Sequence, residues 1–136
     1  MASLESLRIL QTAETLSDEI WAYVADWDSF SKKVVGSQLT RAVDSIGANI
    51  AESFGRFYYG EKRQFLYYAR GSLFETKYWL NRAAKRQLMP QTTVEEYSKR
   101  LNDLARKLNA FINVIKSQQK NGYAINETAT EYFANL

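Results

Sequence analysis

The residues that could do chemistry in this chain are carboxylates, cations and tyrosines, because its 136 residues include no histidine and no cysteine. Without those two side chains, zinc sites, cysteine or serine–histidine nucleophiles and histidine general bases are all excluded. An enzyme would have to work with Asp, Glu, Lys, Arg and Tyr alone. The sequence therefore predicts a non-catalytic protein with no metal and no cofactor, and leaves only a carboxylate nuclease open as an enzyme.

Two pairs of acids are the candidates for carboxylate chemistry. Glu14 and Asp18 are one turn apart in a predicted helix, and Asp26 and Asp28 lie in a predicted connection. A catalytic pair needs a convergent partner, and the sequence identifies none for either pair. We interpret both pairs as solvated surface charge.

Positive charge gathers in the middle third of the chain. Residues 1–40 hold three bases and six acids, residues 41–86 nine bases and four acids, and residues 87–136 six bases and five acids, which gives the net charge of +3. A polyanion such as RNA would meet the middle third. The candidate phosphate contacts are Arg56, Lys62, Arg63, Arg70, Lys77, Arg82, Lys85 and Arg86. The alternative is that these charges only keep the surface soluble.

Four amphipathic helices are predicted to position these groups, over residues 2–24, 37–54, 60–88 and about 92–121. Apolar residues recur in each at three- and four-residue steps, and a single proline and six glycines leave few breaks. Such stripes with short connections favour helices packed about 20° apart. We expect an all-α, antiparallel up-down-up-down four-helix bundle in residues 1–120.

Helix boundaries are predicted from capping residues. Ser37 is expected to cap the second helix after a polar connection at residues 25–36, and Gly55 is expected to follow its end with a positive φ. Pro90 should stop the third helix. Thr92 and Thr93, followed by two glutamates, resemble a capping box for the fourth.

The third helix has a second apolar surface. Tyr67, Phe74 and Tyr78 point away from its core stripe, while a monomeric bundle needs only one such stripe per helix. They could form an aromatic layer inside the bundle, a subunit interface, or a platform for stacked bases. We expect a subunit interface, so the second apolar surface of the third helix predicts a homo-oligomer.

Asn49 raises a separate question, because it lies beside the apolar face of the second helix. A buried amide must be hydrogen-bonded, or it costs about 1–3 kcal/mol. Asn49 could bond across to another helix and fix the register, or it could contact a ligand or RNA. The small residues Gly47 and Ala48 next to it predict close approach of a neighbouring helix.

Two runs of residues carry a resemblance to a known family. The first consists of Arg41, Ala42, Ser45, Ile46, Asn49, Ile50, Ala51, Glu52, Gly55 and Arg56, and the second of Phe65, Leu66, Ala69, Gly71, Ser72, Leu73 and Glu75. Together they resemble the bacterial four-helix-bundle proteins encoded in intervening sequences of 23S ribosomal RNA genes. The chain departs from the pattern at Ser53, where the family usually has glycine, and at Gly47, where proline is common. The motif residues to which the resemblance assigns a structural role are Asn49, Glu52, Gly55, Gly71 and Ser72.

The resemblance also implies an assembly and partners. Such proteins typically form a ring, most often a homopentamer, and they are similar in fold to the accessory protein of diversity-generating retroelements. That protein binds nucleic acid and a reverse transcriptase, so RNA or such a protein is a possible partner by analogy of fold alone. A non-catalytic, RNA-associated oligomer is thus the predicted function, and a protein-interaction scaffold that never binds nucleic acid is the alternative.

The two ends of the chain and its lack of a long apolar run bear on where the protein is located and on how the tail packs. No apolar run approaches the roughly 18 residues of a membrane helix, and the N-terminus does not resemble a signal peptide, so we expect a cytoplasmic protein. Residues 121–136 are too apolar for an ordinary disordered end. We expect this tail to dock on its own bundle or on a neighbouring subunit.

Overall fold

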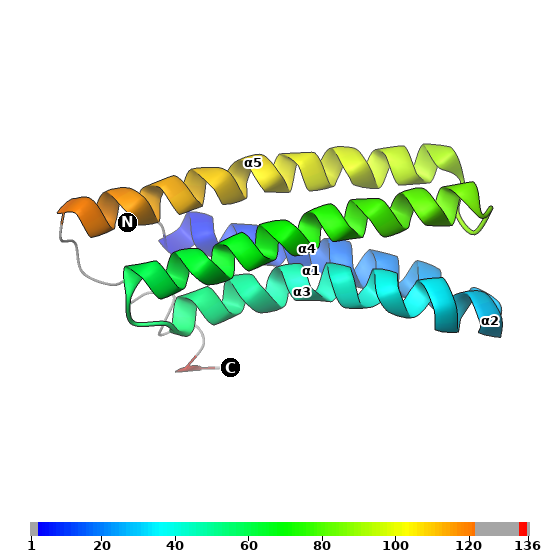
Figure 1. The fold of residues 1–136 in the computed structure, drawn as a ribbon, viewed down its shortest axis with the longest axis horizontal. Helices are drawn as coiled ribbons and strands as arrows, with labels where there is room; N and C mark the ends of the chain where they lie inside the picture. The colour runs from blue at the N-terminus through cyan, green and yellow to red at the C-terminus, as the bar shows by residue number, and fades with distance from the viewer. Residues whose placement is uncertain (1–2, 122–133, 136) are drawn as a thin grey trace.

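The computed structural model describes residues 3–121 and 134–135, and every regular element in that part of the chain is helical. The elements are α1 (Ser3–Ala25), α2 (Ser29–Ser31), the π-helical turn η1 (Lys32–Gly36), α3 (Ser37–Gly55), α4 (Tyr59–Lys85) and α5 (Gln91–Asn121). Four long helices lie side by side, with α2 at one end (Figure 1). The all-helical prediction is confirmed. The predicted docking of the tail concerns residues that lie almost entirely outside the described part.

The interior is built from the apolar stripes that the sequence predicts. They are Ile9, Ala13, Leu16, Ile20 and Val24 in α1, Leu39, Val43, Ile46, Ile50 and Phe54 in α3, Leu66, Ala69, Leu73, Thr76, Leu80 and Ala83 in α4, and Val94, Tyr97, Leu101, Leu104, Leu108, Phe111 and Ile115 in α5. None of these residues is more than 8% exposed. Burying one leucine or isoleucine stabilises a fold by about 1.5–3 kcal/mol, so this core holds the helices together.

Contacts between α1 and α3 give their relative direction. Gly36 lies against Val24, and seven residues earlier in α1 the Ser17 hydroxyl donates to the Asp44 carboxylate. Residue numbers therefore rise along α3 as they fall along α1. The contacts of α4 with α5, described below, show the same relation.

An ion pair joins α1 to α5. Arg100 donates to both carboxylate oxygens of Glu19, at 2.8 and 2.7 Å. This hydrogen bonding is the main reason that the pKa of Glu19 lies below its ordinary value, and it raises the pKa of Arg100. The pair is partly exposed, so it adds little stability and serves mainly to align the two helices.

The second long helix begins earlier than predicted. Asp28 is the N-cap, because its carboxylate accepts from the Ser31 N–H at 2.9 Å, and the chain then continues through α2 and η1 into α3. Ser37 has helical backbone angles and its hydroxyl donates to the Lys33 carbonyl, so it is a helix-interior residue and not a cap. Gly36 is required by packing, since a Cβ there would lie 2.6 Å from Cγ1 of Val24.

The ends of α4 and α5 also differ from the sequence-based boundaries. The third helix was predicted to reach residue 88, but α4 ends at Lys85. Gln87 has φ 60°, its N–H bonds to the Ala84 carbonyl, and the next N–H, of Leu88, bonds to the Ala83 carbonyl. This is the Schellman ending, which usually has glycine at the position of Gln87. On the other side of Pro90, α5 begins at Gln91, so the threonines predicted as its cap lie within the helix.

Replacing Gln87 by glycine should stabilise the protein. Glycine adopts a positive φ without the steric cost that Gln87 bears, so we expect the free energy of unfolding to rise by about 1 kcal/mol in urea denaturation at fixed protein concentration. The matched control is Gln64→Gly, at an exposed position inside α4, which should lower stability by about 1 kcal/mol. Equal losses for both variants would contradict the strain at Gln87.

Candidate nucleic-acid interface

A row of cations lies along the line where α4 meets α5. Arg63, Arg70 and Lys77 are spaced by seven residues, which puts them on one side of α4 at steps of about 10.5 Å. Each donates to a side-chain amide oxygen of α5. The pairs are Arg63 with Gln119, Arg70 with Asn109 at 2.9 Å and Lys77 with Asn102 at 2.6 Å. We call Arg63, Arg70, Lys77 and Lys116 of α5 the basic seam.

The hydrogen-bond partners in the basic seam are neutral. An amide oxygen positions a cation without cancelling its charge, so the positive potential persists at the surface. Tyr67 lies in this potential, with the Arg70 guanidinium 4.9 Å and the Lys116 ammonium 5.8 Å from its ring centre. A hydrogen bond from Lys116 is the largest cause that lowers the pKa of the Tyr67 hydroxyl, and the charge of Arg63 contributes.

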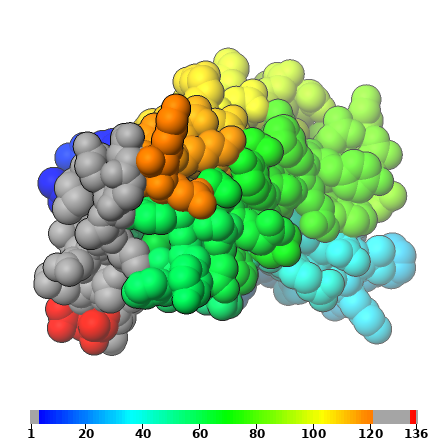
Figure 2. Space-filling model, turned by 60° about the vertical axis from the view of Figure 1, so that its left-hand side comes forward, coloured from blue at the N-terminus to red at the C-terminus, as the bar shows by residue number. Residues whose placement is uncertain are grey.

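Exposed aromatic rings lie beside the basic seam on the outer side of α4. Phe74 and Tyr78 are each 57% exposed, whereas Tyr67 is half-buried against the core. The predicted second apolar surface of this helix is therefore present, and Phe74 and Tyr78 do not form a layer inside the bundle. Figure 2 shows this side of the molecule, where α4 in green adjoins α5 in yellow and orange. Their use as a subunit interface stays a prediction.

Lys62, predicted to contact phosphate, lies inside the bundle. It is 5% exposed, and its Nζ donates to the carbonyls of Ser53 at 3.1 Å and Phe54 at 3.5 Å. Carbonyls in the last turn of a helix lack partners within it and carry partial negative charge, so a buried ammonium satisfies them. Burial lowers the pKa of Lys62. Its spacing of four residues from Leu66 on the core stripe is a signal that could have shown this burial.

The two sequence motifs meet at the turn between α3 and α4. Arg56, at the end of the first run, pairs with Glu52 one turn earlier at 3.4 Å. The same guanidinium lies 4.5 Å from the ring centre of Phe65, which begins the second run. Arg56 is thus half-buried in contacts within its own chain. The motifs describe a helix–turn–helix packing unit.

The sequence profile of the family described as 23S rRNA-intervening sequence protein matches residues 5–110 of this chain. The chain belongs to that family. A crystal structure of a protein of unknown function from the S23 ribosomal protein family of Bacteroides thetaiotaomicron is similar, with a TM-score of 0.71 and 19% identity over 80% of this chain and 98% of that one. At this identity the likeness shows a shared fold alone. None of the curated proteins compared with this chain matches it.

A hydrogen bond from the family motif residue Asn49 across to another helix was one expectation, but the bond that it makes stays within α3. Its side-chain N–H donates to the Ser45 carbonyl of the same helix at 2.8 Å. This bond satisfies one donor of the half-buried amide, so a register-fixing role is not needed. The backbone carbonyl of Ser72 accepts from the Thr76 hydroxyl at 2.8 Å, a bond that does not involve the serine side chain.

The glycines of the motif are not required by the fold of one chain. Gly55 is the last residue of α3, without the positive φ that we expected, and a Cβ at Gly55 or Gly71 would meet no atom within 4 Å. At Gly47 a Cβ would lie 3.8 Å from Ala13 and Leu10 of α1, an ordinary contact. Gly71 is the most informative, since a glycine in an exposed helix interior costs about 1 kcal/mol relative to alanine.

Three further predicted cations lie at the far end of α4. Arg82 lies 6.0 Å from the ring centre of Tyr78 and donates to the Asn81 side chain at 2.8 Å, while Lys85 and Arg86 are exposed. Arg82 and Lys85 follow Tyr78 at helical spacing, so they extend the outer aromatic side of α4. The eight predicted phosphate contacts therefore divide into the basic seam, this outer group and the partnered Lys62 and Arg56.

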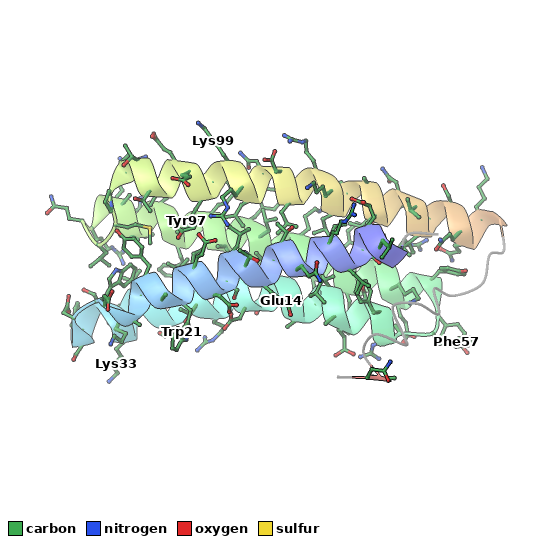
Figure 3. All side chains as sticks on the ribbon, turned by 180° about the vertical axis from the view of Figure 1, so that it is seen from behind. Glu14, Trp21, Lys33, Phe57, Tyr97 and Lys99 are labelled. Atoms are coloured by element: carbon green, nitrogen blue, oxygen red, sulfur yellow. The ribbon has the colours of Figure 1, made fainter. Side chains whose placement is uncertain are left out.

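A groove that sequence reasoning missed runs between α1 and α3, with a volume of about 510 Å³. Small and apolar residues line its floor, namely Leu10, Ala13, Gly47, Ala48 and Ala51. Glu14, Asp18 and Asp44 supply its carboxylates, and we call this feature the acidic groove. Figure 3 shows Glu14 and Trp21 along the edge of α1 that faces α3. Glu14 and Asp18 were interpreted as solvated surface charge, and that interpretation did not anticipate that they border a groove together with Asp44.

Within the described residues, no group of three or more Asp or Glu side chains is arranged to hold a metal ion. No helix among those residues is long and apolar enough to cross a bilayer.

The buried ammonium of Lys62 predicts a specific pH dependence. Because its pKa is lowered in the folded state, the unfolded chain binds more protons in the window below 10.5, so this residue makes stability rise with pH through that window. The difference in unfolding free energy between wild type and Lys62→Met should therefore increase towards pH 10.5. The exposed Lys99→Met is the control for removing one lysine charge from the surface. A flat difference for Lys62→Met would contradict the buried charge.

Proposed function

We propose that this protein is a non-catalytic, oligomeric helical bundle that associates with RNA through the basic seam. The observation that carries the proposal is the row of evenly spaced cations held by neutral amide oxygens. Such cations are already ordered, so little side-chain entropy is lost when a phosphate binds. Contacts between α1 and α3, and between α4 and α5, pair rising with falling residue numbers. They support the antiparallel up-down-up-down arrangement in which the seam is formed.

The aromatic rings beside the seam suit single-stranded RNA. Phosphates would lie on the basic seam, and unpaired bases could stack on Tyr67, which needs no particular base sequence. The name of the family refers to 23S ribosomal RNA, which agrees with an RNA partner and with a cytoplasmic location. The absence of histidine and cysteine supports a binding function over catalysis.

A protein-interaction scaffold is the second candidate function. It is favoured by the exposed Phe74 and Tyr78, because contiguous exposed apolar surface marks protein–protein contacts. Assembly into a ring would bury part of this surface and present the rest to a protein partner.

Affinity for a labelled single-stranded RNA, measured by fluorescence anisotropy, should fall steeply with salt. Four phosphate contacts predict a loss of about 50-fold between about 50 and 200 mM salt. The variant Arg63→Glu, Arg70→Glu, Lys77→Glu should abolish binding while the helix content by circular dichroism is unchanged.

The matched control reverses three exposed bases elsewhere, with the same change in net charge. The variant Arg8→Glu, Lys32→Glu, Lys33→Glu should keep most of the affinity. Equal loss in both triple variants would mean that net charge and not the seam matters. No binding by the wild type, or an affinity independent of salt, would favour the scaffold.

A further inference from the structure

One side of α4 is left largely uncovered by the described residues of its own chain. Going along the helix, this side carries Tyr67, Gly71, Phe74, Tyr78, Arg82 and Lys85, at steps of three and four residues. We call these six residues the outer stripe. Phe74 and Tyr78 are more than half exposed, and among the described residues a Cβ at Gly71 would meet no atom of another element within 4 Å. The outer stripe thus combines aromatic rings, a glycine that leaves the helix surface without a side chain, and two cations.

The acidic groove has the complementary character. Its floor of glycine and alanine can admit large rings, and its carboxylates on Glu14, Asp18 and Asp44 can meet cations. The length also agrees. From Leu10 to Asp18 the groove follows α1 over a spacing of eight residues, about 12 Å. Phe74 and Arg82 have the same spacing along α4.

We propose that the acidic groove of one copy receives the outer stripe of a second copy of this chain. Phe74 and Tyr78 lie on the small-residue floor, and Arg82 and Lys85 meet the carboxylates of Glu14, Asp18 and Asp44. This assignment rests on the proposed function in one respect, that the protein is an oligomer. The basic seam lies on the neighbouring side of α4, so it stays available to RNA.

Gly71 fits this arrangement. In a single chain it only weakens α4, since a Cβ there would meet nothing. Against a second copy, the missing Cβ lets the partner's α1 and α3 approach the helix between Tyr67 and Phe74. The groove itself argues against RNA as its occupant, because its three carboxylates would repel phosphates.

The two surfaces are unlike and lie on different sides of the bundle. A contact between unlike surfaces is heterologous, so each copy that uses its outer stripe still offers a free groove, and assembly continues until a ring closes. A two-fold dimer that joined stripe to stripe would leave the groove empty. This difference makes the proposal testable with charge-exchanged variants.

The test uses two variants that are each repulsive to themselves and attractive to each other. The groove variant carries Glu14→Lys and Asp18→Lys, and the stripe variant carries Arg82→Glu and Lys85→Glu. Molar mass is measured by light scattering after size exclusion at micromolar concentration. The wild type should exceed the 15.7 kDa of one chain, and each variant alone should fall to that mass. An equimolar mixture should rise above the mass of one chain, because each stripe can then meet a groove of opposite charge. Strict alternation of the two variants closes only rings with an even number of chains, so the mass of the mixture need not equal that of the wild type.

Two controls keep the result interpretable. Glu96→Lys with Asp103→Lys makes the same charge change on exposed positions of α5 and should assemble like the wild type. Phe74→Ser with Tyr78→Ser removes the rings without touching the core and should give single chains with normal helix content.

The outcomes separate this inference from the proposed function. A groove variant that assembles like the wild type, or a mixture that stays at the mass of one chain, overturns the groove assignment and leaves oligomerisation standing. A wild type that is a single chain at every concentration overturns both. RNA binding by the single-chain variants is measured separately and does not depend on either result.

Discussion

The constraint on which this structure depends is that α4 is apolar in two directions. Its inner stripe, represented by Leu66, Leu73 and Leu80, is fully buried between α3 and α5 and holds the bundle together. Its outer side presents Phe74 and Tyr78 to solvent. Core packing explains the first surface completely and gives no reason for the second. This second apolar surface is the observation behind the proposal that another copy of the chain covers the outer side of α4.

The charges around α4 fall into separate groups. Cations at its border with α5 are held by amides, which preserves their charge, while Lys62 near its start is buried because it closes the end of α3. Acids gather on the opposite side, around the groove between α1 and α3. One small bundle therefore has a basic side, an aromatic side and an acidic side. That separation of charge agrees with the two proposals, in which the protein binds further copies of itself through one side and RNA through another.

Hydrophobic spacing predicted the helices and nearly every core residue, because burial of one stripe per helix decides this fold. Local signals were less reliable. Ser37 has a capping side chain, but the chain before it was already helical from Asp28, and capping preference cannot outweigh continuous packing. Gln87 holds a positive φ that glycine usually provides. The acidic groove could not be predicted, since it needs residues from two helices whose facing sides only the packed structure defines.

The central claim is that the outer side of α4 is covered in the working protein, and hydroxyl-radical footprinting with mass spectrometry tests it most directly. Phe57 and Tyr58 in the turn before α4 are 69% and 67% exposed and serve as internal references. As protein concentration rises, oxidation of Phe74 and Tyr78 should fall while that of the reference pair stays constant. If Phe74 and Tyr78 remain as reactive as the references at every concentration, the claim is contradicted.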